Sequence, residues 1–204
     1  MFNLKILIFT TLINNLIYNY FESKKKNVCL SLKYTSLVHS IISSLGGILF
    51  KLNLISFHTE EYIVYYSLGY IILDLKLYTF EKELRNEIYI TYFHHLLFYI
   101  GIKYYNTEPE YYASLIITEI STIPLNLMWL SKYHNNYKLA KIYSVVFYLS
   151  FFLFRIVNCS YVMADIYKNN DIKKIYLIST FTSLNYYWFF LMTKKLILKL
   201  KVKL

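Results

Sequence analysis

Two adjacent histidines, His94 and His95, interrupt the apolar stretch YFHHLLFYIG at 92–101. Histidine exchanges a proton near neutral pH, so either ring could serve as a general base or as a nucleophile. Successive residues of a helix point about 100° apart. We therefore expect at most one of the two rings to face a common centre squarely, and the other to contact a neighbouring helix.

Other apolar stretches also contain polar side chains, and several lie at a similar predicted depth. At about 1.5 Å of rise per residue, His39, Asp74 and His94 lie roughly 8–9 Å from one membrane surface, and Asn126 lies slightly nearer to it. Ionisable groups inside a membrane are costly and mark candidate functional sites. Asp74 or His39 could orient a catalytic histidine, whereas the alternative role for His39 is a hydrogen bond between helices.

A second predicted layer contains Glu119 and Arg155, each about 12 Å from the opposite surface. An acid and the only arginine within a span, at equal depth on consecutive helices, predict an ion pair. We interpret this pair as a structural clamp rather than as catalytic machinery.

The elements that must position these residues are membrane-spanning helices. Hydrophobic residues make up 57% of the 204, and charged residues make up 17%, against about 25% in soluble domains. The apolar residues form blocks of nearly the 20 residues that cross a bilayer as helix. The predicted fold is an all-α polytopic bundle of about seven transmembrane helices around a lipid cavity. The predicted spans are Leu4–Phe21, Tyr34–Phe50, Tyr62–Phe80, Ile88–Tyr105, Tyr111–Leu130, Ile142–Met163 and Ile175–Met192.

The distribution of basic residues predicts the orientation of these spans. Fifteen Lys and Arg side chains fall on the side that holds the C-terminus, among them Arg85 and Lys203, and six fall on the other side, among them Lys103. Cytosolic loops carry the excess of Lys and Arg, so we expect a cytosolic C-terminus. The first span could instead be a signal peptide, but Asn14 and Asn15 interrupt it and no small-residue cleavage motif follows. We favour an uncleaved helix.

Several classes of function are disfavoured. The net charge of +10 comes with no basic face or recognition module, so we expect no nucleic-acid partner. Two cysteines are too few for a disulfide framework. The HxxHH cluster of membrane di-iron enzymes would need histidine at position 91, where this chain has Thr91, so we expect no metal.

The string HHLLFYIGIKYYNTEPEYYASLIITEISTIPLNLMWL at 94–130 resembles the signature of the TLC-domain family. That family groups ceramide synthases, translocon-associated TRAM proteins, the ceroid-lipofuscinosis membrane protein and smaller lipid-homeostasis proteins. The likeness covers roughly residues 30 to 200. The matching residues are Ser36, His39, Gly69, Tyr70, Asp74, the histidine pair, Glu119, Ser121, Thr122, Pro124, Asn126, Trp129, Phe151, Arg155, Asn185 and Trp188.

The resemblance implies a helical bundle around a lipid-accessible cavity. In ceramide synthases the histidine pair is thought to serve acyl transfer from acyl-CoA to a sphingoid-base amine, which makes His94, His95, Asp74 and His39 the candidate catalytic residues. Those enzymes carry a further aspartate pair where this chain has Glu119 alone, so it looks closer to the smaller members. Glu119, Arg155, Asn126, Pro124, Trp129 and Asn185 are the expected structural residues.

These observations leave three readings of function. We favour a role in membrane lipid homeostasis, by lipid binding or lipid modification. One alternative is a ceramide-synthase-like N-acyltransferase, and this is the only reading that requires acyl-CoA, as a co-substrate. The other alternative is a translocon-associated protein. We expect no cofactor and membrane lipids as partners, and a homo-oligomer stays open.

The expected organisation is a first helix with a basic loop at 1–26, a TLC domain at 27–200 and the end of a basic tail at 201–204. The expected location is a membrane like that of the endoplasmic reticulum, or a host membrane if the source is a virus.

Overall fold

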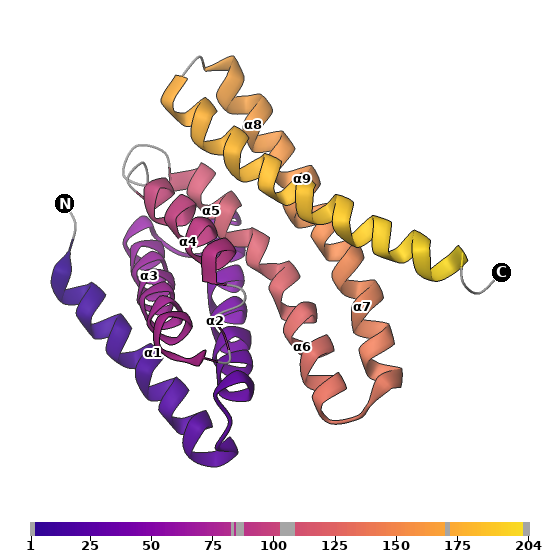
Figure 1. Ribbon diagram of the computed structural model, residues 1–204. Helices are drawn as coiled ribbons and strands as arrows, with labels where there is room; N and C mark the ends of the chain where they lie inside the picture. Colours follow the sequence, from indigo (N-terminus) through magenta and orange to yellow (C-terminus); the bar gives the residue numbers. More distant parts are fainter. Residues whose placement is uncertain (1–2, 83, 85–87, 103–108, 170–171, 202–204) are drawn as a thin grey trace.

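Seven helical segments form one bundle in the computed structural model, which describes residues 3–82, 84, 88–102, 109–169 and 172–201 (Figure 1). No strand occurs within those ranges. The end of the predicted span at Tyr105, the tail at 202–204, and Arg85, Lys103 and Lys203 lie outside the described residues. The segments are α1 (Leu4–Lys25), α2 (Val28–Lys51), α3 (Phe57–Phe80), α4 (Ile88–Ile102), α5–η2–α6 (Pro109–Ile117, Thr118–Ser121, Thr122–Tyr133), α7–η3–α8 (Tyr137–Phe151, Phe152–Val157, Asn158–Lys168) and α9 (Ile172–Lys201).

Short polar turns explain why the segments begin and end where they do. The side chains of Asn3, Asn27 and Asn136 each accept a hydrogen bond from a backbone N–H in the first turn of α1, α2 and α7. Lys26 and Asn135 take the left-handed backbone conformation directly before α2 and α7. The α1–α2 and α6–α7 turns lie at one end of the bundle, and α8 meets α9 at the opposite end (Figure 1). Turns that lie at alternate ends of the bundle are what the predicted membrane spans require.

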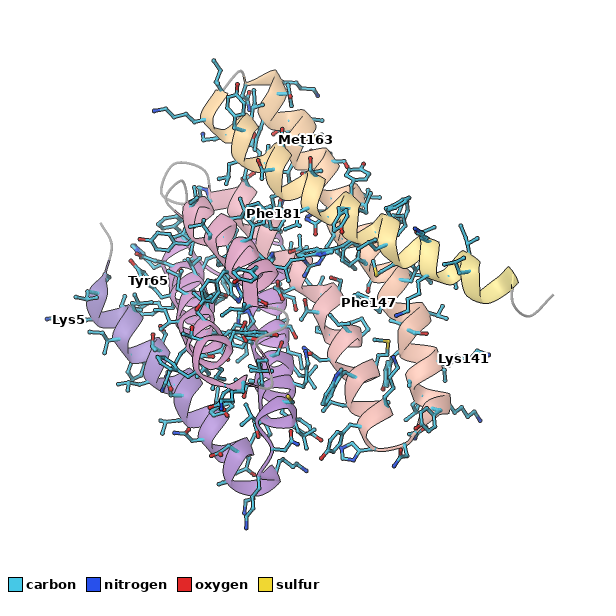
Figure 2. All side chains as sticks on the ribbon, viewed as in Figure 1. Lys5, Tyr65, Lys141, Phe147, Met163 and Phe181 are labelled. Carbon is cyan, nitrogen blue, oxygen red and sulfur yellow. The ribbon has the colours of Figure 1, made fainter. Side chains whose placement is uncertain are left out.

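The outer surface of the bundle is apolar, as expected of helices in lipid. Large side chains such as Leu16 on α1, 68% exposed, and Val145 on α7, 55% exposed, face outward. By length and composition, the segments Val28–Lys51, Pro109–Tyr133 and Tyr137–Lys168 could each cross a membrane. Lys5 and Lys141, at the starts of α1 and α7, project away from the bundle (Figure 2). The all-α architecture predicted from the sequence is confirmed.

Small residues allow the helices around α2 to approach closely. Ser40, Ser43, Ser44, Gly46 and Gly47 are buried along α2, which contacts α1, α3, α5 and α6. Close approach of backbones over small residues is the usual basis of helix association in membranes.

Helix α1 packs against α3 through polar contacts. Asn14, wholly buried, donates from Nδ2 to the carbonyl oxygen of Tyr66 at 3.1 Å. The Thr10 hydroxyl donates to the carbonyl oxygen of Tyr65 at 2.8 Å. In an apolar setting such hydrogen bonds hold α1 in a defined register on α3.

A matched pair of glycine substitutions tests this packing. A Cβ at Gly69 on α3 would lie 2.7 Å from the backbone of Thr10, whereas a Cβ at Gly101 on α4 would meet nothing within 4 Å. We expect Gly69→Ala to lower the melting temperature, because one backbone must move away from the other. Gly101→Ala should leave that temperature unchanged or raise it, since alanine is the better helix former by about 1 kcal/mol. Thermal unfolding in detergent measures both, and equal melting temperatures would contradict the close α1–α3 contact.

Two irregular helical turns lie at mid-bundle. Residues Thr118–Ser121 form a 3-10 turn, shortly before Pro124, which has no N–H and whose ring crowds the carbonyl of Ile120. Residues Phe152–Val157 form a π-helical turn, a feature that often occurs at functional sites. The two turns carry Glu119 and Arg155.

Candidate functional site: a polar chamber inside the bundle

A cavity of about 130 Å³ lies where α2, α3, α4, η2, α6 and η3 meet. We call it the chamber. Its wall is half polar, in contrast to the apolar outer surface of the bundle. The residues that line it are Ser36, His39, Tyr70, Ile71, His94, His95, Phe98, Glu119, Thr122 and Arg155.

One wall of the chamber holds a histidine–aspartate pair. His95 Nε2 lies 2.7 Å from Asp74 Oδ2, and both residues are buried. The other carboxylate oxygen, Oδ1, accepts a hydrogen bond from the Tyr70 hydroxyl at 3.3 Å. Residues 70 and 74 lie one turn apart on α3, so this helix presents the hydroxyl and the carboxylate together. Each carboxylate oxygen of Asp74 therefore has its own hydrogen-bond partner.

This geometry determines which nitrogen of His95 can act on a ligand. An ionised carboxylate only accepts hydrogen bonds, so Nε2 carries the proton that Asp74 binds. When that ring is neutral its lone pair lies on Nδ1, and Nδ1 is buried with no hydrogen-bond partner among the residues that the structure describes. A ring held in one tautomer by a carboxylate is the arrangement of a general base.

The neighbouring His94 lies in a different environment. Its ring centroid is 5.7 Å from that of Trp188 and 6.0 Å from that of Phe181, both on α9. Its Nδ1 atom is also buried, and no described residue makes a hydrogen bond to it. Both histidines line the chamber, but His95 alone contacts Asp74, while His94 packs on a neighbouring helix as expected for the second ring.

His39 supports the chamber rather than orienting His95. Its ring stacks on that of Tyr70, with centroids 4.0 Å apart and planes 9° from parallel. Its Nδ1 atom lies 3.3 Å from the hydroxyl of Ser43, one turn along α2. Of the two residues considered for orienting a histidine, Asp74 makes the contact, and His39 stacks on Tyr70, whose hydroxyl donates to Asp74.

Opposite the histidines, Arg155 connects four polar groups. Its Nη2 atom lies 3.5 Å from Glu119 Oε1, so the ion pair expected from the sequence is present. Its guanidinium also donates to Ser121 Oγ at 2.7 Å, to Thr122 Oγ1 at 3.0 Å and to Asn185 Oδ1 at 3.5 Å. The charge is therefore buried with both a counter-charge and neutral acceptors, as a buried arginine requires.

A comparison with protein families covers the part of the chain that forms the chamber. The family model described as the TLC domain matches residues 30–194, which hold the whole chamber. The chain belongs to the TLC-domain family. No curated protein and no solved structure matches it. Together with the apolar helices, membership makes the chain an integral membrane protein with a lipid-related role. Which branch of the TLC family it joins stays a prediction.

The remaining predicted residues of the TLC domain lie around the chamber at different distances. Asn126 donates from Nδ2 to the Ser36 hydroxyl at 3.0 Å and so ties α6 to α2 at the chamber wall. Asn185 accepts from Arg155, and Pro124 follows the turn that carries Glu119. Trp129 stands apart near the end of α6, where its ring stacks on Tyr133 and lies below Lys33 Nζ at 5.9 Å.

Residues from both predicted layers, among them His39, His94, Glu119 and Arg155, line one chamber. Helix α2 begins at Val28 and not at Tyr34, so His39 lies about 16 Å from that helix end rather than about 8 Å. His39 therefore reaches the level of Glu119 and Arg155, and all three line the chamber.

The sequence resemblance includes Tyr70 and Thr122, but sequence reasoning gave neither residue a role at the site, and both line the chamber. With 24 tyrosines in the chain, one more tyrosine gives no signal by its type. The available signal is spacing, because Tyr70 precedes Asp74 by four residues on one helix face. Within the described residues, no group of three or more His, Cys, Asp and Glu side chains is placed to hold a metal ion.

Proposed function

We propose that this TLC-domain protein binds a membrane lipid through the polar part of that lipid and acts in membrane lipid homeostasis. The observation that supports the proposal is the chamber itself: a half-polar cavity inside an apolar bundle, lined by His94 and His95, whose buried Nδ1 atoms have no hydrogen-bond partner among the described residues. Buried ring nitrogens of this kind cost free energy until a hydrogen-bond partner satisfies them, and the Nδ1 atom of His95, whose Nε2 faces Asp74, needs a donor. A lipid hydroxyl or amide N–H would supply that donor.

A lipid extraction experiment tests this proposal. The purified protein is expected to retain a defined lipid in mild detergent, and His95→Leu should lower the amount retained by about tenfold, the effect of one lost buried hydrogen bond. The matched control is His58→Leu, at an exposed histidine in the first turn of α3. Mass spectrometry of the extracted lipids measures the molar ratio. The same lipid content in all three proteins would overturn the proposal.

A second candidate function is N-acyl transfer, and one observation favours it. The Asp74 carboxylate holds the His95 ring with Nδ1 as the acceptor atom, which is the arrangement needed to remove a proton from an attacking amine. In that reaction the amine nitrogen bonds to the acyl carbon as the carbon–sulfur bond of acyl-CoA breaks. The proton passes from the amine to His95 and then to the leaving thiolate.

A further inference from the structure

Glu60 is a carboxylic acid buried at the end of the bundle opposite the α1–α2 turn. It lies in the first turn of α3 and is 0% exposed. Both of its carboxyl oxygens are buried, and no described residue makes a hydrogen bond to either of them. The start of the helix does not need this side chain, because the Ser56 hydroxyl accepts from the backbone N–H of Thr59 at 3.4 Å. Among the described residues, a negative charge on Glu60 therefore has no hydrogen-bond donor.

The side of α3 that carries Glu60 faces the inside of the bundle. Residues four and seven positions apart lie on one face of a helix. Val64, four positions after Glu60, is buried in a cluster with Ile116 of α5. Ser67, seven positions after Glu60, contacts Ser43 of α2 through hydroxyls 2.8 Å apart. Neighbouring helices therefore cover this face of α3, and Glu60 lies at the end of it.

The charged groups around Glu60 provide little compensation for a buried charge. Lys51, exposed at the end of α2, is the basic residue whose charge acts on this carboxyl. Helix α1 packs against α3 at Gly69, about 180° around the helix from Glu60. On α4, the titratable ring of His95 contacts Asp74, about 21 Å further along α3. The other charged or titratable side chains near the starts of α1, α3 and α5 are exposed or half-buried, and they are Lys5, His58, Glu61 and Glu110.

A neutral carboxyl in this place costs far less than an ionised one, so the side chain keeps its proton to a higher pH than usual. Glu60 precedes the predicted span Tyr62–Phe80, and burial raises the pKa of its carboxyl from 4.5 to about 7, although Lys51 opposes the rise. The first turn of a helix favours a negative charge, but this effect is small beside the cost of burying an unpaired ion. The proton is therefore lost near neutral pH.

We propose that Glu60 is a proton-binding site that controls how the start of α3 packs in the bundle. The neutral acid stays buried and keeps α3 against α2, α4 and α5. Loss of the proton drives the carboxylate out to water, towards Lys51, and loosens this end of the bundle. The site lies about 21 Å along α3 from Asp74 at the chamber, and it does not depend on the proposed function.

The direction of the pH dependence follows from proton linkage. The folded protein holds this proton more tightly than the unfolded chain does, so the stabilisation is complete below about pH 4.5 and is lost as the pH rises to about 7. Acid conditions should therefore close this end of the bundle, and alkaline conditions should open it.

Hydrogen exchange at the α2–α3 turn tests the proposal, with Glu60→Gln as a neutral side chain of the same shape. The two proteins are compared in detergent at the same pH, so that the intrinsic exchange rate cancels, and mass spectrometry follows peptides that cover residues 52–64. From about pH 5 to about pH 8, the exchange of the wild type relative to the variant should rise by about 70-fold, as linkage requires for this change of pKa. Glu61→Gln, at the adjacent half-buried acid, is the matched control and should show no such rise.

Two further comparisons keep the outcome clear. Peptides of the α6–α7 turn should exchange alike in both proteins, because that turn lies at the other end of the bundle. Lys51→Gln leaves Glu60 in place and should move the loss of protection to higher pH, since Lys51 favours the ionised form. This variant decides the matter if Glu60→Gln does not fold. The same exchange ratio at both pH values, an equal rise in Glu61→Gln, or no shift in Lys51→Gln would overturn the proposal.

Discussion

Arg155→Leu is expected to lower the free energy of unfolding by about 3–5 kcal/mol, the cost of breaking a buried ion pair by removing one partner. The change leaves the carboxylate of Glu119, whose side chain is 15% exposed, without its counter-charge. It also removes the donor for Ser121, Thr122 and Asn185 at once. The folded yield in detergent and the melting temperature should both fall.

Glu119→Leu is the complementary change and has a different physical reason. Arginine cannot lose its proton, so its charge would stay buried, although Ser121, Thr122 and Asn185 would still accept hydrogen bonds from it. We therefore expect destabilisation here too, by a smaller amount than in Arg155→Leu. The double variant should regain part of the yield, because both charges leave together.

The matched control for this series is Lys141→Leu, which removes an exposed charge on α7 and should leave the yield unchanged. A double-mutant cycle of melting temperatures measures the coupling between residues 119 and 155. Equal yields for both single variants and the double variant would mean that the two charges are not buried together, and the chamber as described would be wrong.

The ion pair of Glu119 and Arg155 was predictable from the sequence, because charges in neighbouring apolar segments are costly unless they pair with each other. The overall helical fold was predictable for the same kind of reason, since spans of nearly 20 apolar residues have few alternatives in lipid. The asparagines that begin α2 and α7 can also be recognised in the sequence. Hydropathy alone places the start of the second span at Tyr34, which is six residues after the helix begins at Val28.

The detail of the site was not predictable, because it depends on how helices rotate and where they depart from α geometry. No periodicity indicates that Phe152–Val157 is π-helical, and this turn sets the direction of Arg155. Hydropathy also gives no rotation for α4, so it could not decide which of His94 and His95 faces Asp74. That choice depends on the packing of α4 between α3 and α9.

The choice between the two histidines leads to the prediction with the largest effect on activity. If the second candidate function holds, protein in nanodiscs given labelled long-chain acyl-CoA and a sphingoid base forms an amide. His95→Ala should lower the rate by about 10²–10⁴-fold, the usual contribution of a general base. Asp74→Asn should lower it by at least about tenfold, because an amide does not hold the tautomer that leaves Nδ1 free.

His94→Ala is expected to cost less than His95→Ala, since the His94 ring packs on Trp188 and Phe181, whereas His95 is the histidine that contacts Asp74. His58→Ala, at an exposed position, is the control for the removal of a histidine, and the melting temperature of each variant shows that it is folded. Full activity in folded His95→Ala would remove the general-base role. Absence of amide from the folded wild-type protein, over a range of acyl chains and amines, would leave lipid binding as the function, because the pair of His95 and Asp74 would then act only to hold the polar part of the lipid.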